Sequence, residues 1–246
     1  MTKENIEPIL NEPALYIKNK KILIIADLHI GIEEELKESG VNTGSQTEKI
    51  FNKIKKISKK EKPEKIILLG DIKHNIPNST YQERMDVKNF LERIKKISKV
   101  EIIPGNHDGF IKKLCPDDVK IHSSDGIIID EIALIHGHKW PKKEILEQKN
   151  IIMGHTHPTI MLTDRMNIKT YEPCWIKTNF IRNKIKEKYD TINNPNLYIV
   201  PAFNILCGGI AINKEGIIGP IKNIVDLDNS RVFLLDGTLL GKVKNL

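Results

Sequence analysis

The stretch KILIIADLH, residues 21–29, sets the pattern on which the rest of the chain is built. Five apolar residues follow one another, and the run then ends in Asp27 and His29. A short, β-branched and almost wholly apolar run is typical of a strand that is buried on both faces. We therefore predict a buried strand here, with an aspartate and a histidine just beyond its carboxyl end.

Four further runs of the same kind end in the same way. They read KIILLGDIKH (65–74), VEIIPGNHD (100–108), IALIHGH (132–138) and NIIMGHTH (150–157). Between the first three runs of the chain, apolar residues recur every three to four positions, which predicts helices over Gln46–Lys60 and Tyr81–Lys99. Alternating strands and helices predict an α/β fold made of βαβ units around a largely parallel sheet.

The polar ends of these runs are the candidate functional residues. Ligands of open α/β sheets bind beyond the carboxyl ends of the strands, and seven of the eight histidines lie in the five polar clusters. His122 alone lies outside them, and we expect it to be structural. Imidazole, carboxylate and amide groups together suit Mn²⁺, Fe or Zn²⁺, whereas Ca²⁺ and Mg²⁺ prefer oxygen ligands. Because one ion needs fewer ligands, we predict two ions about 3.5–4 Å apart that share a carboxylate.

Composition places the chain among ordinary soluble proteins. Its 246 residues suit one large domain, and 39% hydrophobic with 29% charged residues is enough for a sizeable core. The first residues contain no apolar signal-peptide core, and no run approaches the ~20 apolar residues of a membrane helix. We therefore expect a cytoplasmic protein with no membrane partner and make no prediction of its oligomeric state. The three cysteines have no C-x-x-C spacing, so we expect reduced thiols and no cysteine metal site.

The net charge of +7 is a weak indication of a nucleic-acid partner. Basic proteins often bind anions, nucleic acid among them. Only five of the 39 basic residues are arginine, however, and arginine is the residue best suited to bidentate phosphate recognition. Nucleic acid is therefore a candidate partner that the composition does not favour.

The order of the clusters, D-x-H, G-D-x-x-H, G-N-H-D, H-G-H and G-H-x-H, resembles that of the calcineurin-like metallophosphoesterase superfamily. The later PAFN (201–204) and LLDGTLLG (234–241) resemble more narrowly the archaeal SbcD-related phosphoesterases and the DNA-ligase-associated metallophosphoesterases. The resemblance implies a four-layer αββα sandwich, in which two facing sheets are flanked by helices. It also implies two divalent transition-metal ions, with Mn favoured and Fe, Zn or Ni as alternatives.

Residue roles follow from the resemblance, position by position. It implies one metal held by Asp27, His29, Asp71 and His157, and a second held by Asp71 as the bridging ligand with Asn106, His136 and His155.

Three further residues are implied around the metals. His107 is the catalytic histidine, and Asp108 either orients it or caps a helix. His74 contacts phosphate or supports the ligands, with a plain surface loop as the alternative. His138 is at best a residue behind the ligands.

The implied reaction is an in-line hydrolysis, in which the ions activate a water and neutralise charge on the phosphate while His107 protonates the leaving group. Our leading hypothesis is a phosphodiesterase acting on nucleotide-type diesters, cyclic ones included. The alternative is a metal-dependent DNA or RNA nuclease. A non-enzymatic scaffold is less favoured, because such scaffolds usually lose the catalytic histidine or a ligand, and none is missing here.

The single domain, residues 1–246, is expected to carry a basic and aromatic insertion at about 164–196. We predict an extended piece near Trp175, a short helix to about Tyr189 and a closing turn. Interleaved basic and aromatic residues can form a platform for single-stranded nucleic acid, but we favour aromatic residues that pack on the core. Residues 198–213 and 230–243 are expected to supply strands of the second sheet.

Overall fold

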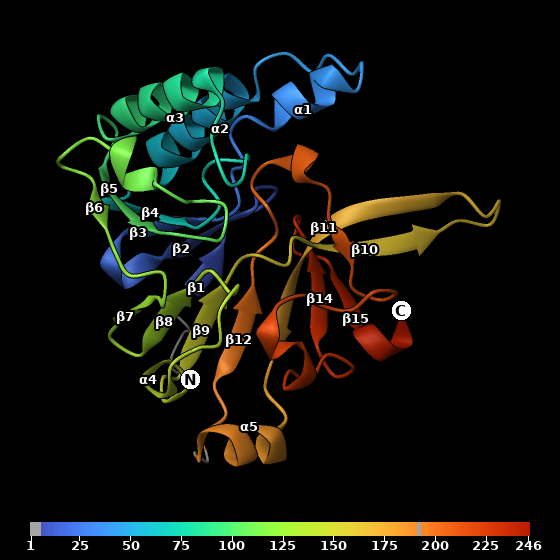
Figure 1. The fold of residues 1–246 in the computed structure, drawn as a ribbon. Coiled ribbons are helices and arrows are strands. Elements are labelled where there is room, and N and C mark those ends of the chain that lie inside the picture. The colour runs from blue at the N-terminus through green and yellow to red at the C-terminus, as the bar shows by residue number, and fades with distance from the viewer. Residues whose placement is uncertain (1–5, 191–192) are drawn as a thin grey trace.

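The computed structural model describes residues 6–190 and 193–246, which form two β-sheets that face each other with helices on their outer sides (Figure 1). The first sheet has the order β1-β2-β3-β4-β5-β6, and the second has the order β13-β10-β11-β12-β9-β8-β7, with β14 paired to β11 and β15 to β14. This arrangement confirms the predicted αββα sandwich.

The elements of the first half are β1 (Ile6–Pro8), β2 (Ala14–Ile17), β3 (Ile22–Ile25), α1 (Ile32–Glu38), α2 (Gln46–Glu61), β4 (Lys65–Leu69), α3 (Tyr81–Ile94), β5 (Lys99–Ile103) and β6 (Lys120–Ile121). Those of the second half are β7 (Ile127–Ile129), β8 (Ile132–Ile135), α4 (Lys143–Leu146), β9 (Asn150–Met153), β10 (Pro158–Thr163), β11 (Lys169–Thr178), α5 (Arg182–Tyr189), β12 (Asn196–Ile199), β13 (Ile210–Ala211), β14 (Arg231–Leu234) and β15 (Leu239–Lys242).

The five apolar runs do not share one central sheet as predicted. The first three form β3, β4 and β5, which are parallel neighbours in the first sheet. The last two form β8 and β9, which are parallel neighbours in the second sheet. Between β5 and β8 lie short strands, turns and one short 3-10 helix, Ile111–Lys113, and no α-helix connects the two strands.

Strand β3 shows why each run is apolar throughout. Leu23 and Ile25 belong to the core between the first sheet and the helices α2 and α3, whereas Ile22 and Ile24 belong to the core between the two sheets. Side chains of a strand alternate between its faces, and both faces of this strand are covered. Each such side chain contributes about 1.5–3 kcal/mol when it is fully buried.

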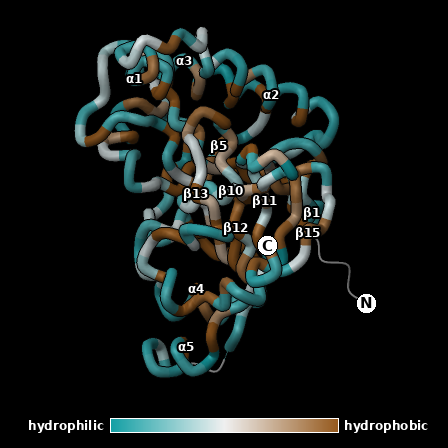
Figure 2. Tube along the Cα trace, turned by 90° about the vertical axis from the view of Figure 1, so that its right-hand side faces the viewer, coloured by the Kyte–Doolittle hydropathy of each residue, from teal (hydrophilic) through white to brown (hydrophobic). Residues whose placement is uncertain are grey.

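A third core covers the outer side of the second sheet. It joins Ile151 of β9 to Leu146 of α4 and Ile185 of α5. Figure 2 shows hydrophobic residues gathered along the central strands, while α5 is largely hydrophilic on its outside. Three apolar layers therefore separate four layers of secondary structure.

The helix predictions are confirmed at their starts and differ at one end. Helix α2 begins at Gln46, where the side chain of Ser45 accepts the N–H of Glu48, and Thr80 caps α3 in the same way. Helix α3 ends at Ile94 rather than at Lys99, because Lys99 already pairs with Lys65 in the sheet. Pairing with β4 thus outweighs the continuing helical periodicity of this segment.

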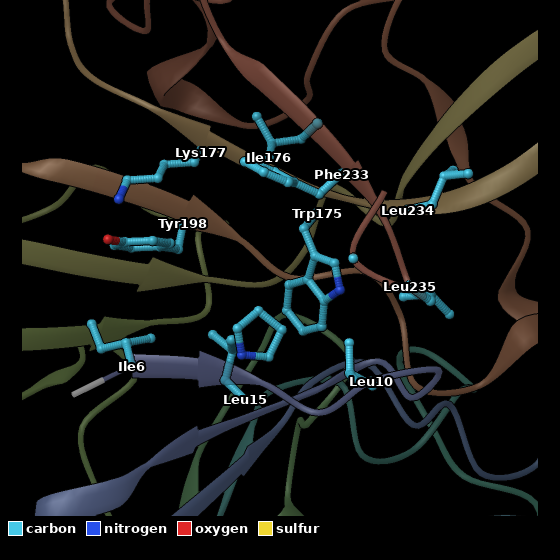
Figure 3. Close-up of a pocket in the computed structure, with 12 residues that line it drawn as sticks. Ile6, Leu10, Leu15, Trp175, Ile176, Lys177, Tyr198, Phe233, Leu234 and Leu235 are labelled. Atoms are coloured by element: carbon cyan, nitrogen blue, oxygen red, sulfur yellow. The ribbon is translucent and has the colours of Figure 1, made fainter. Parts of the chain in front are cut away.

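The segment 164–196 takes part in the second sheet. Its extended part is β11, which pairs with β10, β12 and β14 and is therefore integral to the second sheet. Trp175 is 5% exposed, and Figure 3 shows its indole reaching from β11 toward Leu15 beside an apolar pocket of about 320 Å³. The predicted packing of Trp175 on the core is confirmed, as is a short helix ending at Tyr189.

The strands expected in the later part of the chain form only in part. Residues 230–243 form the hairpin of β14 and β15, whereas 198–213 supply only the end of β12 and the short β13, with a loop between them.

The three cysteines form no disulfide. Within residues 6–190 and 193–246, no helix has the length and apolar character to span a membrane.

Candidate metal centre

The carboxyl ends of the five predicted strands meet at one place between the two sheets. Three groups of three side chains form there, and within each group the ligand atoms all lie within 4.8 Å of one another. Two of the groups contain a carboxylate: one is Asp27, His29 and His157, and the other is Asp71, His136 and His155. The third group consists of His29, His74 and His107. Each of the two carboxylate-containing groups holds three of the four residues of one implied set; Asp71 is absent from the first group and Asn106 from the second.

Asp71 lies between the two groups. Its Oδ2 atom is 3.7 Å from Nε2 of His29 in the first group and 3.3 Å from Nε2 of His136 in the second. Asp27 also lies near a histidine of each group. Its Oδ1 atom is 3.3 Å from Nε2 of His157 in the first group and 3.7 Å from Nδ1 of His136 in the second. Both carboxylates therefore lie within 4 Å of imidazole nitrogens from the two groups.

After β3, β4 and β9 the backbone passes through left-handed conformations at the polar residues. The residues concerned are Asp27 (φ 57°), His29 (φ 42°), Asp71 (φ 50°), His155 (φ 67°) and His157 (φ 46°). Positive φ is uncommon outside glycine, although aspartate and histidine adopt it more readily than most residues. Strained backbone of this kind tends to gather at functional sites.

Two glycines let the side chains approach so closely. A Cβ atom at Gly105 would lie 2.1 Å from Oδ1 of Asp71 and 2.8 Å from Nε2 of His136. A Cβ atom at Gly70 would lie 2.1 Å from Nδ1 of His136. Both positions therefore require glycine, because any side chain there would displace a ligand group.

Burial keeps two of the imidazoles neutral. Burial lowers the pKa of His29 to about 3 and that of His155 to about 4. A neutral imidazole offers the lone pair that a metal needs.

The pair of Asp71 and His136 behaves differently. Burial alone would raise the pKa of Asp71, but His136 holds it below its usual range. Burial likewise opposes protonation of His136, yet Asp71 and Asp27 raise its pKa to about 9. A positive charge is thus required beside these carboxylates, and a bound cation would supply it in place of the proton.

The donor atoms fit two divalent cations. The Nε2 atoms of His29, His136 and His157 are buried and make no hydrogen bond. Buried polar atoms without a partner are rare in proteins, and each needs an explanation. All three lie within 4 Å of a buried carboxylate oxygen. Imidazole nitrogens and carboxylate oxygens are together a donor set for Mn²⁺, Fe or Zn²⁺.

Asn106 and His107 line the same cleft, which has a volume of about 400 Å³. The backbone N–H of His107 donates to Oδ1 of Asp71 over 2.9 Å, and its ring Nδ1 contacts the carbonyl oxygen of His74. A carbonyl oxygen can only accept, so Nδ1 carries a hydrogen and Nε2 is the other nitrogen of the ring. Asn106 is exposed at the cleft.

His74 lies behind His29 rather than on a plain surface loop. Its Nδ1 is 3.2 Å from Nδ1 of His29, and its Nε2 is 2.7 Å from Oε2 of Glu35 on α1. Its ring also stacks beside that of His107, with centroids 5.9 Å apart. His74 therefore links helix α1 to the edge of the first group.

Asp108 differs from both sequence interpretations. Its buried carboxylate accepts the backbone N–H of Ile72 and that of Gly105, each over 2.8 Å. The ring of His107 instead contacts His74, and the short 3-10 helix that follows is capped by Phe110. Asp108 thus ties together the loops that follow β4 and β5.

Sequence reasoning missed Glu83, which holds the loop that carries His74. Glu83 is fully buried, and its Oε1 accepts the N–H of His74 over 2.8 Å and that of Asn75 over 2.7 Å. The available signal was T-x-x-E at Thr80–Glu83, which is typical of a helix start. That pattern predicts local capping, not a contact with the preceding loop.

The PAFN stretch also has a structural role that the sequence did not assign. The N–H of Phe203 donates to the carbonyl of Ala26 over 2.9 Å, and Nδ2 of Asn204 donates to the carbonyl of Leu28 over 2.9 Å. These two hydrogen bonds link the segment that follows β12 of the second sheet to the loop that carries Asp27.

The two remaining histidines lie as expected. His138 is behind the ligands, with its ring centroid 5.2 Å from that of His136. His122 is outside the site, and its Nε2 lies 2.8 Å from Oε2 of Glu101.

Two facing sheets carry two histidine–carboxylate groups at their joined strand ends, a donor set that suits metal ions. The family model for calcineurin-like phosphoesterases matches residues 20–200, and the chain belongs to that family. It is accordingly a hydrolase that acts on phosphoesters, and its family uses a binuclear metal centre.

One solved structure shows the same fold, and two others are more distantly similar. The Pseudomonas putida nuclease MPE is 22% identical, with a TM-score of 0.59 over 94% of this chain and 98% of that one. The phosphoesterase YfcE from E. coli is 12% identical, with a TM-score of 0.38 over 90% and 97%. A predicted phosphoesterase from Streptococcus pneumoniae TIGR4 is 11% identical, with a TM-score of 0.29 over 89% and 91%.

Proposed function

We propose that this protein is a phosphodiesterase that hydrolyses nucleotide-type phosphate diesters, cyclic ones included, with two divalent metal ions. The observation that carries the proposal is the position of Asp71 between two histidine groups, with His107 lining the same cleft. We favour Mn²⁺, with Fe, Zn²⁺ and Ni²⁺ as alternatives. When bound, the two ions would lower the pKa of a water molecule and neutralise charge on the phosphate.

The proposed ligand sets follow the two groups. Asp27, His29 and His157 hold one ion, His136, His155 and Asn106 hold the other, and Asp71 bridges both. The buried imidazole nitrogens without hydrogen-bond partners support these assignments. Asn106 is included because it lines the cleft together with Asp71 and His155.

His107 is the proposed proton donor to the leaving oxygen. Its Nδ1 atom is engaged by the carbonyl of His74, which fixes the ring and leaves Nε2 for the substrate. An alkoxide leaves a phosphate diester poorly unless it is protonated, and a positioned acid typically contributes about 10²–10⁴-fold. Asp108 and His74 support this geometry through the loops on either side and need not touch the substrate.

A nuclease acting on DNA or RNA ends is the second candidate. The exposed side chain of Tyr171 lines a cavity that borders on His157, so an aromatic residue does lie near the proposed metal ligands. The fold likeness to the nuclease MPE is compatible with this alternative. A nuclease must hold several phosphates, so its activity should fall steeply between about 50 and 200 mM salt.

A substrate panel with Mn²⁺ tests the proposal. We would compare cyclic and linear dinucleotides, bis-p-nitrophenyl phosphate, p-nitrophenyl phosphate and single-stranded oligonucleotides at two salt concentrations. We expect the small diesters to be hydrolysed fastest, with little response to salt. A preference for the monoester would overturn the diesterase, and steeply salt-dependent cleavage of oligonucleotides alone would establish the nuclease instead.

A further inference from the structure

A second cavity opens beside the metal cleft, and its function is not explained by the metal ligands. Its volume is about 340 Å³, and it shares His157 and Gly209 with the cleft. Its other lining residues come from β10, from β11 and from the loop between β12 and β13, and they include Thr159, Tyr171, Pro173, Asn204, Ile205 and Gly208. A group bound at the metals could therefore extend directly into it.

Tyr171 forms one wall of this cavity. Strand β10 starts one residue after His157, and Tyr171 pairs with Met161 on it while Pro173 pairs with Thr159. Alternate residues of a strand share a face, so Tyr171 and Pro173 lie on the same face of β11. The side chain of Tyr171 is 55% exposed and lines the cavity together with His157. Strands β10 and β11 form a hairpin that projects from the body of the protein (Figure 1).

Thr159 lines the cavity and carries a hydroxyl group that has no hydrogen-bond partner. The residue is only 9% exposed, and its Oγ1 atom is buried without a hydrogen-bond partner. An unpaired buried hydroxyl is unfavourable, and a ligand atom that bonds to it removes the penalty. A hydroxyl both donates and accepts, so it can pair with either kind of polar edge.

The opposite wall is built from backbone. A Cβ atom at Gly209 would lie 2.1 Å from the methyl carbon Cγ2 of Thr159 and 2.8 Å from the carbonyl oxygen of His157, so a side chain there would clash with this wall. Nothing lies within 4 Å of the Cβ position of Gly208. Ile205 adds an apolar side chain that is 71% exposed. The cavity thus combines apolar surfaces with one polar contact, which suits a flat heteroaromatic ring.

We propose that this cavity binds the base of the nucleotide whose phosphate lies at the metal centre, with Tyr171 as the stacking surface and the Thr159 hydroxyl on the edge of the base. The inference rests on the proposed function and names its substrate class. Stacking on an aromatic side chain is available to every base, so the subsite favours nucleotides over base-free diesters without strong preference for one base.

Two diesters with the same leaving group test the subsite. Thymidine 5′-(p-nitrophenyl phosphate) carries a base, and methyl p-nitrophenyl phosphate does not. The wild type should have the higher kcat/KM for the nucleotide. Tyr171→Ala should reduce the ratio of the two kcat/KM values about tenfold, whereas Tyr171→Phe should keep it. Thr159→Val should reduce the ratio as well, because it removes only the hydroxyl. Ile168→Ala, an exposed change in the turn of the same hairpin, is the matched control and should leave both values unchanged.

Binding gives a readout that does not depend on hydrolysis. Calorimetry with adenosine monophosphate and with ribose 5-phosphate compares two ligands that carry the same phosphate and differ in the base. We expect the adenosine nucleotide to bind about tenfold more tightly and Tyr171→Ala to abolish the difference. Melting temperatures of both Tyr171 variants show whether they are folded, and Tyr171→Phe keeps the comparison valid if the alanine variant is not.

The two proposals fail in different ways. If the wild type binds both calorimetric ligands equally, or if Tyr171→Ala leaves the binding and kinetic ratios intact, the subsite is wrong even though both diesters are hydrolysed. If neither diester is hydrolysed while the base still strengthens binding through Tyr171, the diesterase is wrong and the subsite remains.

Discussion

The Oδ2 atom of Asp71 lies 3.3 Å from the Nε2 atom of His136, although Asp71 follows a strand of the first sheet and His136 follows a strand of the second. This contact joins the two halves of the sandwich at the proposed metal centre. The carboxylate and the imidazole are both buried. The predictions below start from this meeting of two sheets and move outward.

Removal of metal should abolish activity and lower stability together. The buried carboxylates and imidazole nitrogens are left without compensation when no cation is bound, so chelation should stop hydrolysis of bis-p-nitrophenyl phosphate and lower the melting temperature. Mn²⁺ at a hundredfold excess over its Kd should restore activity and add about 2.7 kcal/mol of stability per site. Elemental analysis should find up to two ions per chain. Asp71→Asn should weaken both sites, and full activity in a verified metal-free sample would exclude the two-metal centre.

His107→Ala should retain the metals and lose rate. The loss should be about 10²–10⁴-fold for a substrate with an alkoxide leaving group and much smaller for p-nitrophenolate, which needs little protonation. Single-turnover rates on both kinds of substrate, with metal content measured alongside, check this. Equal losses for the two leaving groups would speak against a proton donor.

Glu83→Ala should loosen the loop that carries His74. Its carboxylate accepts the N–H groups of His74 and Asn75, and each buried donor left without a partner costs about 1–3 kcal/mol. We expect lower stability in urea unfolding and a reduced rate, because the His74 carbonyl that holds the ring of His107 becomes less well placed. Glu83→Gln keeps an oxygen acceptor and should retain most of both. An alanine variant with wild-type stability and rate would refute this role.

Protonation of Glu101 should lower the stability of the protein in acid. Burial raises the pKa of this carboxyl, but Lys65 and His122 outweigh burial and hold the pKa at about 2, below the ordinary value of 4.5. A carboxyl whose pKa is lower in the folded state stabilises the fold above pH 4.5, and its contribution is lost as the pH falls from there toward 2. Glu101→Gln should therefore be less stable than the wild type at pH 7 and show a flatter loss between pH 5 and pH 2. Glu187→Gln, an exposed change on α5, is the control and should follow the wild-type curve.

Trp175→Ala should act on stability rather than on substrate binding. The indole is buried between the two sheets, and replacing a core tryptophan by alanine typically costs about 3–5 kcal/mol. Chemical unfolding measures this loss, and single-stranded DNA binding at matched folded fractions measures any change in affinity. Weaker DNA binding with an unchanged free energy of unfolding would show that Trp175 is a stacking residue after all.

The strands and the polar residues at their ends could be predicted because the signals are local. Residues 22–25 are apolar on both faces whatever they pack against, and the aspartate and histidine that follow need solvent, a partner or a metal. The starts of α2 and α3 were equally local, since Ser45 and Thr80 are capping residues.

Tertiary structure decided the partners of these local elements. Whether a strand joins the first or the second sheet depends on pairing between distant segments. The apolar runs of β5 and β8 are alike in sequence, so the sequence could not show that the chain changes from the first sheet to the second between them. Asp108 was assigned by its nearest neighbours in sequence and Glu83 was missed, yet both carboxylates accept hydrogen bonds from backbone groups of other loops. The sequence predicts the segment 164–196 as one unit. In the structure, Trp175 is buried in the core, whereas Tyr171 is exposed and lines the cavity beside the metal cleft. The two differ because one part of β11 lies in the core and the other part lies in the projecting hairpin. Sequence determined which groups this protein carries at its strand ends, and long-range packing determined which of them meet.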